Sequence, residues 1–195
     1  MGTDVISENS TLTFQIERIS NRERVLDYMV FRNFSPSLEK YLMQNPQLTE
    51  EKAVEILTRT YDDQGQFLRR SDSSSPQQGE LVQFAAVAQD ENSREVYRET
   101  NGVVGVVDVF QKSTNALELK NLRVHESARR KGIATALVEK VQEYAIQAVD
   151  RATVFLNYDP ENIGAMHLYA SRGFRNDTNE EFQMIWSPLQ DERCL

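Results

Sequence analysis

Alternating apolar and polar positions along the chain predict its strands. Alternation with a period of two, or a short apolar and β-branched run, occurs over residues 12–19, 81–88, 103–110, 116–124, 151–157 and 182–186. The second and third of these runs are separated by a polar, acidic segment at 89–101. We therefore expect these two runs to form a hairpin with a long acidic tip.

Apolar residues at helical spacing predict helices over 21–34, 49–61, 134–148 and 162–172. Ser20 or Asn21 is the candidate N-cap of the first helix, and Thr49 of the second. Gly173 follows the last helix at the position where a helix often ends in a left-handed glycine. The segment 33–46 contains Ser-Pro and Asn-Pro pairs, which predict a loop or a short helical turn.

This order of elements predicts an α/β fold in one domain. Strands come first as a meander and later alternate with helices, so the central sheet is expected to be mixed, with an antiparallel N-terminal half, a parallel central pair and helices beside it. A length of 195 residues suits one such domain. We expect a polar lead at 1–11, the domain at 12–189, a flexible insertion at 62–80 rich in serine and glutamine, and a tail at 190–195.

A basic glycine turn at 129–135 joins the 116–124 strand to the helix that follows. Free N–H groups and the dipole at a helix start favour an anion, and three cations precede Gly132. The spacing is neither a Walker loop nor a dinucleotide fingerprint, which need more glycines. Taken alone, such a turn is more often a solvated basic loop. The strand before it and the amphipathic helix after it favour a phosphate-binding site.

Composition narrows the class of protein. The net charge of -8 argues against general nucleic-acid binding, which needs basic surface, and suits cationic substrates such as amines. The single cysteine, Cys194, allows no intrachain disulfide, and two histidines with one cysteine give no metal-site spacing, so we expect no metal. No apolar run is long enough to span a membrane, and the acidic N-terminus does not resemble a targeting peptide. These features predict a cytoplasmic protein that does not bind membranes, or a plastid stromal one if a presequence has been removed.

A second motif lies about 30 residues after the turn and reads N-x-x-A-x-x-L-Y-x-x-x-G-F from Asn162 to Phe174. With Arg129, Gly132 and Ala134 forming R-x-x-G-x-A, the two motifs resemble the GCN5-related N-acetyltransferase (GNAT) superfamily. The resemblance is strong over 102–174, weaker over the first strand and helices, and absent from 62–80. The residues at 121–124 and 128–132 most resemble those of the cyanobacterial and plastid branch of the superfamily.

The resemblance implies acetyl-CoA as the acetyl donor. The backbone of Leu122, Arg123 and Val124 would pair with the pantetheine arm and polarise the thioester carbonyl. Asn162 would contact the cofactor. The CoA pyrophosphate would bind at the turn, formed by Arg129, Arg130, Lys131, Gly132, Ile133, Ala134 and Thr135.

The resemblance also implies two catalytic side chains. Tyr169 would protonate the departing CoA thiolate. Glu118 matches the glutamate base of the histone-acetylating branch and is expected on the same strand face as Val124. Asn157 stands where the bacterial ribosomal-protein N-terminal acetyltransferases carry a glutamate, and an amide cannot act as a base. The base is therefore Glu118 or a water relay, while the other interpretation of Glu118 is a strand glutamate paired with a lysine.

The acceptor is left open by the sequence. The 33–46 loop and the acidic segment 175–181 are expected to flank its binding site, and acidic residues there suit a cationic amine. A protein N-terminus or lysine is the first choice, and a small amine such as a polyamine is the enzymatic alternative. A third interpretation is a non-catalytic acetyl-CoA sensor or assembly subunit. The sequence does not indicate an oligomeric state.

Overall fold

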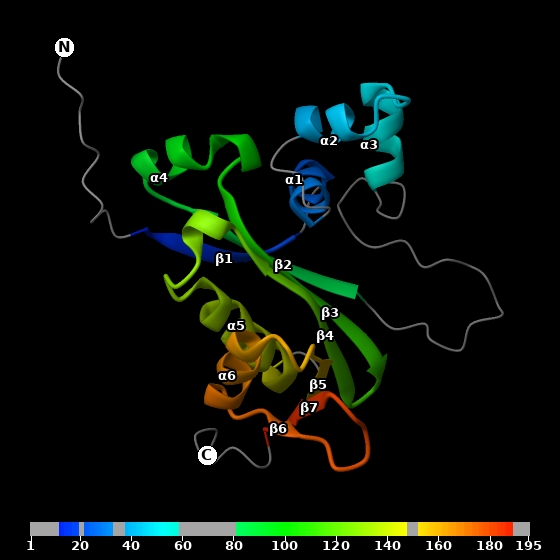
Figure 1. The fold of residues 1–195 in the computed structure, drawn as a ribbon, viewed down its shortest axis with the longest axis vertical. Helices are drawn as coiled ribbons and strands as arrows, with labels where there is room; N and C mark the ends of the chain where they lie inside the picture. The colour runs from blue at the N-terminus through cyan, green and yellow to red at the C-terminus, as the bar shows by residue number, and fades with distance from the viewer. Residues whose placement is uncertain (1–11, 20–21, 33–37, 59–80, 148–151, 189–195) are drawn as a thin grey trace.

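The computed structural model describes residues 12–19, 22–32, 38–58, 81–147 and 152–188. They form a seven-stranded sheet of order β1-β2-β3-β4-β5-β7-β6 (Figure 1). The strands are β1 (Phe14–Arg18), β2 (Leu81–Ala88), β3 (Val103–Ser113), β4 (Ala116–Val124), β5 (Thr153–Asn157), β6 (Arg175–Asn176) and β7 (Gln183–Trp186). Strands β4 and β5 are parallel, and the other neighbours are antiparallel. The predicted mixed α/β sheet is confirmed.

The helices cover both faces of this sheet. They are α1 (Arg22–Arg32), α2 (Leu38–Gln44), α3 (Glu50–Thr58), α4 (Glu91–Val96), α5 (Ile133–Gln147) and α6 (Ile163–Ser171), with short 3-10 turns at Arg98–Thr100 and Glu126–Ala128. Within the described ranges, none of them has the length and apolarity that a membrane span requires. The predicted lead, the 62–80 insertion and the tail with Cys194 lie outside the described residues.

Two buried clusters lie on opposite faces of the sheet. The larger cluster joins β2, β3 and β4 to α5 and α6, and includes Leu117, Leu137 and Tyr169. The smaller cluster joins the sheet to α1 through Val25, Tyr28 and their neighbours. Helices α2 and α3 pack on α1 and extend that side of the molecule (Figure 1). The strand residues between these clusters are therefore buried on both sides, which explains the continuous apolar run of β2.

The hairpin of β2 and β3 is confirmed, but its tip is helical. Asp90 begins α4 by accepting a hydrogen bond at 2.7 Å from the backbone N–H of Ser93. The sequence of α4 is polar and too short for a helical period to be recognised. Likewise, the 33–46 segment contains a regular helix, α2, and the two-residue strand β6 lies in a segment that we expected to be a loop.

Strand β4 contains a β-bulge at Asn121. On β3, one residue lies between Val106 and Asp108, whereas two residues lie between their partners Arg123 and Lys120 on β4. Asn121 takes a left-handed φ of 52°. The extra residue inverts the side-chain alternation beyond it. Val124 packs against the larger cluster, on the α5 face, while Glu118 lies on the α1 face, so the expectation that these two residues share a face is wrong.

Candidate active site

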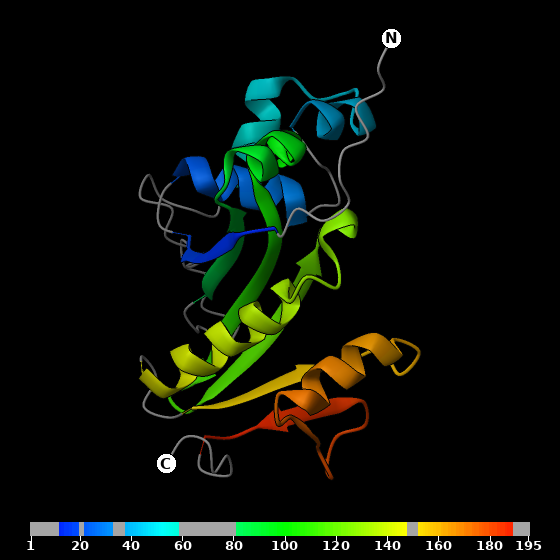
Figure 2. The same cartoon turned by 90° about the vertical axis from the view of Figure 1, so that its left-hand side faces the viewer.

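The candidate site begins where β4 and β5 separate. These strands are paired only from Ala116 to Glu118 on β4, opposite Thr153 to Phe155 on β5. Beyond Glu118 the strands diverge, as Figure 2 shows, while β4 continues to Val124. The backbone of Leu122, Arg123 and Val124 therefore lies on a strand edge that β5 does not cover. An unpaired edge of this kind can hydrogen-bond an extended ligand.

The basic turn lies at the end of this edge. Arg130 has a φ of 63° and Gly132 a φ of 81°, so two left-handed residues precede α5. Among the described residues, no backbone carbonyl accepts a hydrogen bond from the N–H groups of 130–135. Consecutive free N–H groups at a helix start form a concave anion site. The predicted residues Ile133, Ala134 and Thr135 form the first turn of α5.

Charge and backbone freedom suit this turn to phosphate. Arg129, Arg130 and Lys131 are exposed, and no ion pair joins them to the described acidic residues. A Cβ added at Gly132 would meet no atom within 4 Å. Glycine is therefore favoured here by its left-handed backbone and not by crowding.

Gly105 on β3 sets the place of α5. A Cβ at this residue would lie 2.7 Å from Ile133 Cγ2 and 3.1 Å from Leu137 Cδ1. Gly105 also pairs with Val124 across the sheet. The absence of a side chain at Gly105 thus lets the start of α5 approach the sheet beside the end of β4, which brings the basic turn and the free edge together.

Tyr169 enters the larger cluster from α6. Its ring packs against Phe174 with a centroid distance of 5.8 Å. Burial raises the pKa of the Tyr169 phenol to about 12. The hydroxyl therefore carries its proton at neutral pH and is a hydrogen donor. Asn162 caps α6, because its Oδ1 accepts from the Ala165 N–H at 3.0 Å.

Glu118 lies at the last paired position before the strands separate, on the α1 face. Its side chain is buried and forms ion pairs at 2.9 Å with Lys112 Nζ and Lys120 Nζ. Burial raises the pKa of this carboxyl, but the two lysines outweigh it, so the pKa lies below its usual value. Glu118 is therefore ionised at neutral pH, and its two ion pairs agree with the other interpretation, a strand glutamate paired with lysine.

The sheet separates the two predicted catalytic residues. Tyr169 belongs to the cluster on the α5 face, and Glu118 points to the α1 face. Asn157 is exposed on β5, and its Oδ1 accepts from Gln183 Nε2 at 3.3 Å.

The sequence analysis missed a buried polar group on the α1 face. Asp108 accepts hydrogen bonds from Tyr28, Gln83 and Asn121. Two signals were present in the sequence. Asp108 is a charged residue within the apolar run of β3, and the apolar phase of β4 slips by one at Asn121.

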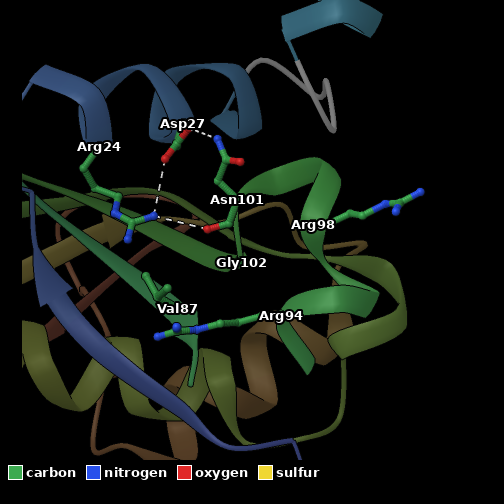
Figure 3. Close-up of a pocket in the computed structure, with 7 residues that line it drawn as sticks. All are labelled: Arg24, Asp27, Val87, Arg94, Arg98, Asn101 and Gly102. Carbon is green, nitrogen blue, oxygen red and sulfur yellow. Dashed lines mark hydrogen bonds and ion pairs between the residues drawn. The ribbon is translucent and has the colours of Figure 1, made fainter. Parts of the chain in front are cut away.

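A cavity of about 510 Å³ lies away from these residues, between α1, the end of β2 and α4 (Figure 3). Arginines line it. Arg24 forms an ion pair with Glu17 at 2.8 Å and donates a hydrogen bond to the Asn101 carbonyl at 3.2 Å, and Asp27 lies beside Arg24 and Asn101. These contacts tie α1 to the β2–β3 connection. The arginines of this cavity are thus used in structural contacts, and it contains none of the predicted site residues.

Within the described parts of the chain, no cluster of three histidine, cysteine, aspartate or glutamate side chains could hold a metal ion.

A strand edge that β5 does not cover and that leads into a basic turn lined by N–H groups is consistent with the family that the two sequence motifs resemble. The sequence model of the acetyltransferase (GNAT) family matches residues 51–174. The chain belongs to this family. The predicted GNAT resemblance and the prediction of an acetyltransferase are thereby confirmed. None of the curated proteins matches the acetyltransferase sequence.

Solved structures share the fold of this acetyltransferase at low identity. An integron cassette protein from the mobile metagenome of V. cholerae is 19% identical with a TM-score of 0.54, covering 88% of this chain and 91% of that one. Aminoglycoside N-acetyltransferase AAC(6')-Iy, in complex with CoA, is 16% identical with a TM-score of 0.52, over 89% and 95%. Arabidopsis thaliana NAA60, with a bisubstrate analogue, is 18% identical with a TM-score of 0.51, over 90% and 98%.

Proposed function

We propose that this acetyltransferase moves the acetyl group of acetyl-CoA to a primary amine of a protein, either an N-terminus or a lysine. The observation that carries the proposal is that the β4 edge not covered by β5 continues into the N–H groups of the basic turn. The edge would bind the pantetheine amides in an extended form, and the turn would bind the pyrophosphate. Arg129 to Thr135 and Leu122 to Val124 are the residues of this donor site.

The donor site assigns a role to each remaining side chain. The backbone N–H groups near Val124 would polarise the thioester carbonyl as negative charge develops on its oxygen. Tyr169 would donate its hydroxyl proton to the departing thiolate from the α5 face. Glu118 would take the proton of the amine on the α1 face, directly or through water. Asn162 would support the cofactor at the start of α6.

Charge supports a cationic acceptor. The connection between β6 and β7 carries Asp177, Glu180 and Glu181, of which the two glutamates are exposed, in a chain of net charge -8. An acidic surface raises the local concentration of ammonium groups. Peptides and polyamines both carry such groups, so charge alone does not choose between them.

The release of CoA thiol from acetyl-CoA tests the function. The acceptors would be peptides with a free N-terminus, N-terminally blocked peptides with one lysine, and spermidine, with a reaction lacking acceptor as the blank. We expect thiol release and a 42 Da mass gain, about one acetyl group, with one of the peptide classes. Transfer to spermidine alone would support a small-amine enzyme instead.

Calorimetry separates the enzyme from a sensor. Binding of acetyl-CoA without turnover across the panel would support the non-catalytic interpretation. In Gly132→Glu, a carboxylate and a strained left-handed residue replace the glycine of the turn, so we expect no measurable CoA binding. Binding retained in that variant at wild-type strength would contradict the phosphate site. Gln147→Glu, which adds a carboxylate at the exposed far end of α5, is the matched control and should bind CoA like wild type.

A further inference from the structure

The buried carboxylate of Asp108 connects three elements of the α1 face. Its Oδ1 accepts from the hydroxyl of Tyr28 on α1 and, at 2.9 Å, from Gln83 Nε2 on β2. Its Oδ2 accepts from Asn121 Nδ2 on β4 at 2.6 Å. Asp108, Gln83 and Tyr28 are all buried. Each carboxylate oxygen thus has its own donors, and the hydrogen bond from Asn121 to Oδ2 joins Asp108 to β4.

The Asn121 contact acts on the residue that forms the bulge. Residues other than glycine rarely take a left-handed backbone, and asparagine does so most readily because its short side chain hydrogen-bonds locally. Here the side chain that fixes the conformation is bound to Asp108. The hydrogen bond therefore stabilises the bulge and, with it, the direction of the backbone that follows.

The backbone that follows is Leu122 to Val124. If the bulge were lost, β4 would become a regular strand. Each N–H group of this segment would then point in the direction opposite to its present one. The turn at 129–135 would keep its own conformation, since its left-handed residues and helix start lie beyond the bulge. Loss of the bulge should therefore change the position of the thioester and leave pyrophosphate binding unchanged.

We propose that Asp108 is a positioning residue for acetyl transfer. Its Oδ2 holds Asn121 in the left-handed conformation, and this places the β4 backbone N–H groups against the thioester carbonyl. The proposal rests on the proposed function. It adds a side chain that touches neither substrate yet determines kcat.

Exchanging the carboxylate and the amide tests the contact. Asn121→Asp keeps a residue that tolerates the left-handed conformation but sets two carboxylates against each other. Asp108→Asn in that background restores one hydrogen bond, with donor and acceptor exchanged, and leaves an Oδ1 for Tyr28 and Gln83. Asp108→Asn alone allows the Asn121 amide to rotate by half a turn and present its oxygen, so its effect is small.

We expect Asn121→Asp to lower kcat about 10- to 100-fold, the loss that follows from breaking a hydrogen bond to a charged group. The Kd for CoA should stay within about threefold, because the turn is unchanged. The double variant should recover kcat to within about threefold of wild type. If Asn121→Asp does not fold, Asn121→Gly keeps the left-handed backbone without the contact, and its kcat should fall about three- to tenfold.

Two kinetic results would overturn the positioning role. One is a wild-type kcat in Asn121→Asp and Asn121→Gly, whatever the change in melting temperature. The other is a double variant as slow as Asn121→Asp. Amide resonances of residues 122–124 give a readout that needs no turnover: they should shift in Asn121→Asp and return in the double variant. An inactive wild type would reject the proposed function, whereas unshifted resonances would reject the positioning role.

Discussion

At the scale of single residues, the pKa values of the proposed acid and the proposed base are shifted in opposite directions. Burial raises the pKa of Tyr169 to about 12, and two lysines hold the pKa of Glu118 below its usual value despite its burial. Both groups therefore keep one protonation state near neutral pH. In the proposed reaction, each would exchange a proton only when charge develops beside it.

Replacing Tyr169 with phenylalanine removes the proposed acid but keeps the ring that packs on Phe174. We expect kcat to fall about a hundredfold, the usual contribution of a positioned acid, with the Kd for acetyl-CoA unchanged. Steady-state kinetics and calorimetry would measure these. Tyr144→Phe, on α5 against Phe84, is the control and should keep full activity. Full activity in Tyr169→Phe would assign the proton to solvent or another group.

Glu118→Gln tests the base through the pH profile. We expect a lower kcat at neutral pH and a smaller loss at high pH, where the free amine forms without a base. Glu143→Gln, which breaks only an exposed pair with Lys140, is the matched control. A profile in Glu118→Gln that follows wild type would remove Glu118 from the mechanism.

The same carboxylate links stability to acid. Because the folded pKa of Glu118 lies below the unfolded one of about 4.3, its stabilising contribution is complete above that pH. The contribution is lost as the pH falls through the folded pKa. Urea unfolding of wild type and Glu118→Gln should therefore differ near neutral pH and converge in acid.

At the scale of elements, the sequence determined most of the sheet but not its local departures. Apolar, β-branched runs located strands β2 and β3, period-two alternation located β4, and Asn162 and Gly173 bracketed α6. Element α4 was missed because six mostly polar residues give no apolar period, and β6 because two residues give none at all. The bulge was missed because the slip of apolar phase at Asn121 was treated as continued alternation.

The Gly105→Ala variant tests how α5 is placed. A methyl group would lie 2.7 Å from Ile133 Cγ2, so the helix must shift, and we expect a loss of about 1–3 kcal/mol in the free energy of unfolding. Urea denaturation would measure it, and the Kd for CoA should rise with the shift of the turn. Gly164→Ala, in the open first turn of α6, should be neutral or more stable by up to about 1 kcal/mol. A Gly105→Ala variant as stable as wild type would contradict the close packing.

At the scale of the whole molecule, charge is distributed unevenly. The chain carries a net charge of -8, yet three cations precede Gly132 at the start of α5. The family could be predicted from the sequence because its two motifs are local, whereas the acceptor could not, because it depends on loops brought together from distant segments. The Tyr28–Asp108 contact joins residues 80 positions apart and has no local signature.

The basic turn predicts a salt-dependent affinity. We expect the Kd for acetyl-CoA to rise with salt, since the Debye length falls from about 10 Å at 0.1 M to about 3 Å at 1 M. Lys131→Ala should weaken binding about two- to fivefold at low salt and flatten this dependence. Lys140→Ala, on the same helix but paired with Glu143, should leave both unchanged. An affinity that ignores salt would contradict a charged donor site.

The short pairing of β4 with β5 has a consequence for the motions of the protein. Three residue pairs join the strands β5, β7 and β6 to the rest of the sheet. Val154, Leu156 and Trp186 also pack in the larger cluster, but because the backbone seam is narrow, we expect the segment from β5 to β7 to open locally more often than the centre of the sheet. Amide protons of β5 should therefore exchange with solvent faster than those of β2 and β3. A donor molecule lying along β4 and beside α6 would contact both parts of the sheet. Its binding should therefore slow amide hydrogen exchange in β5, far from its own contacts.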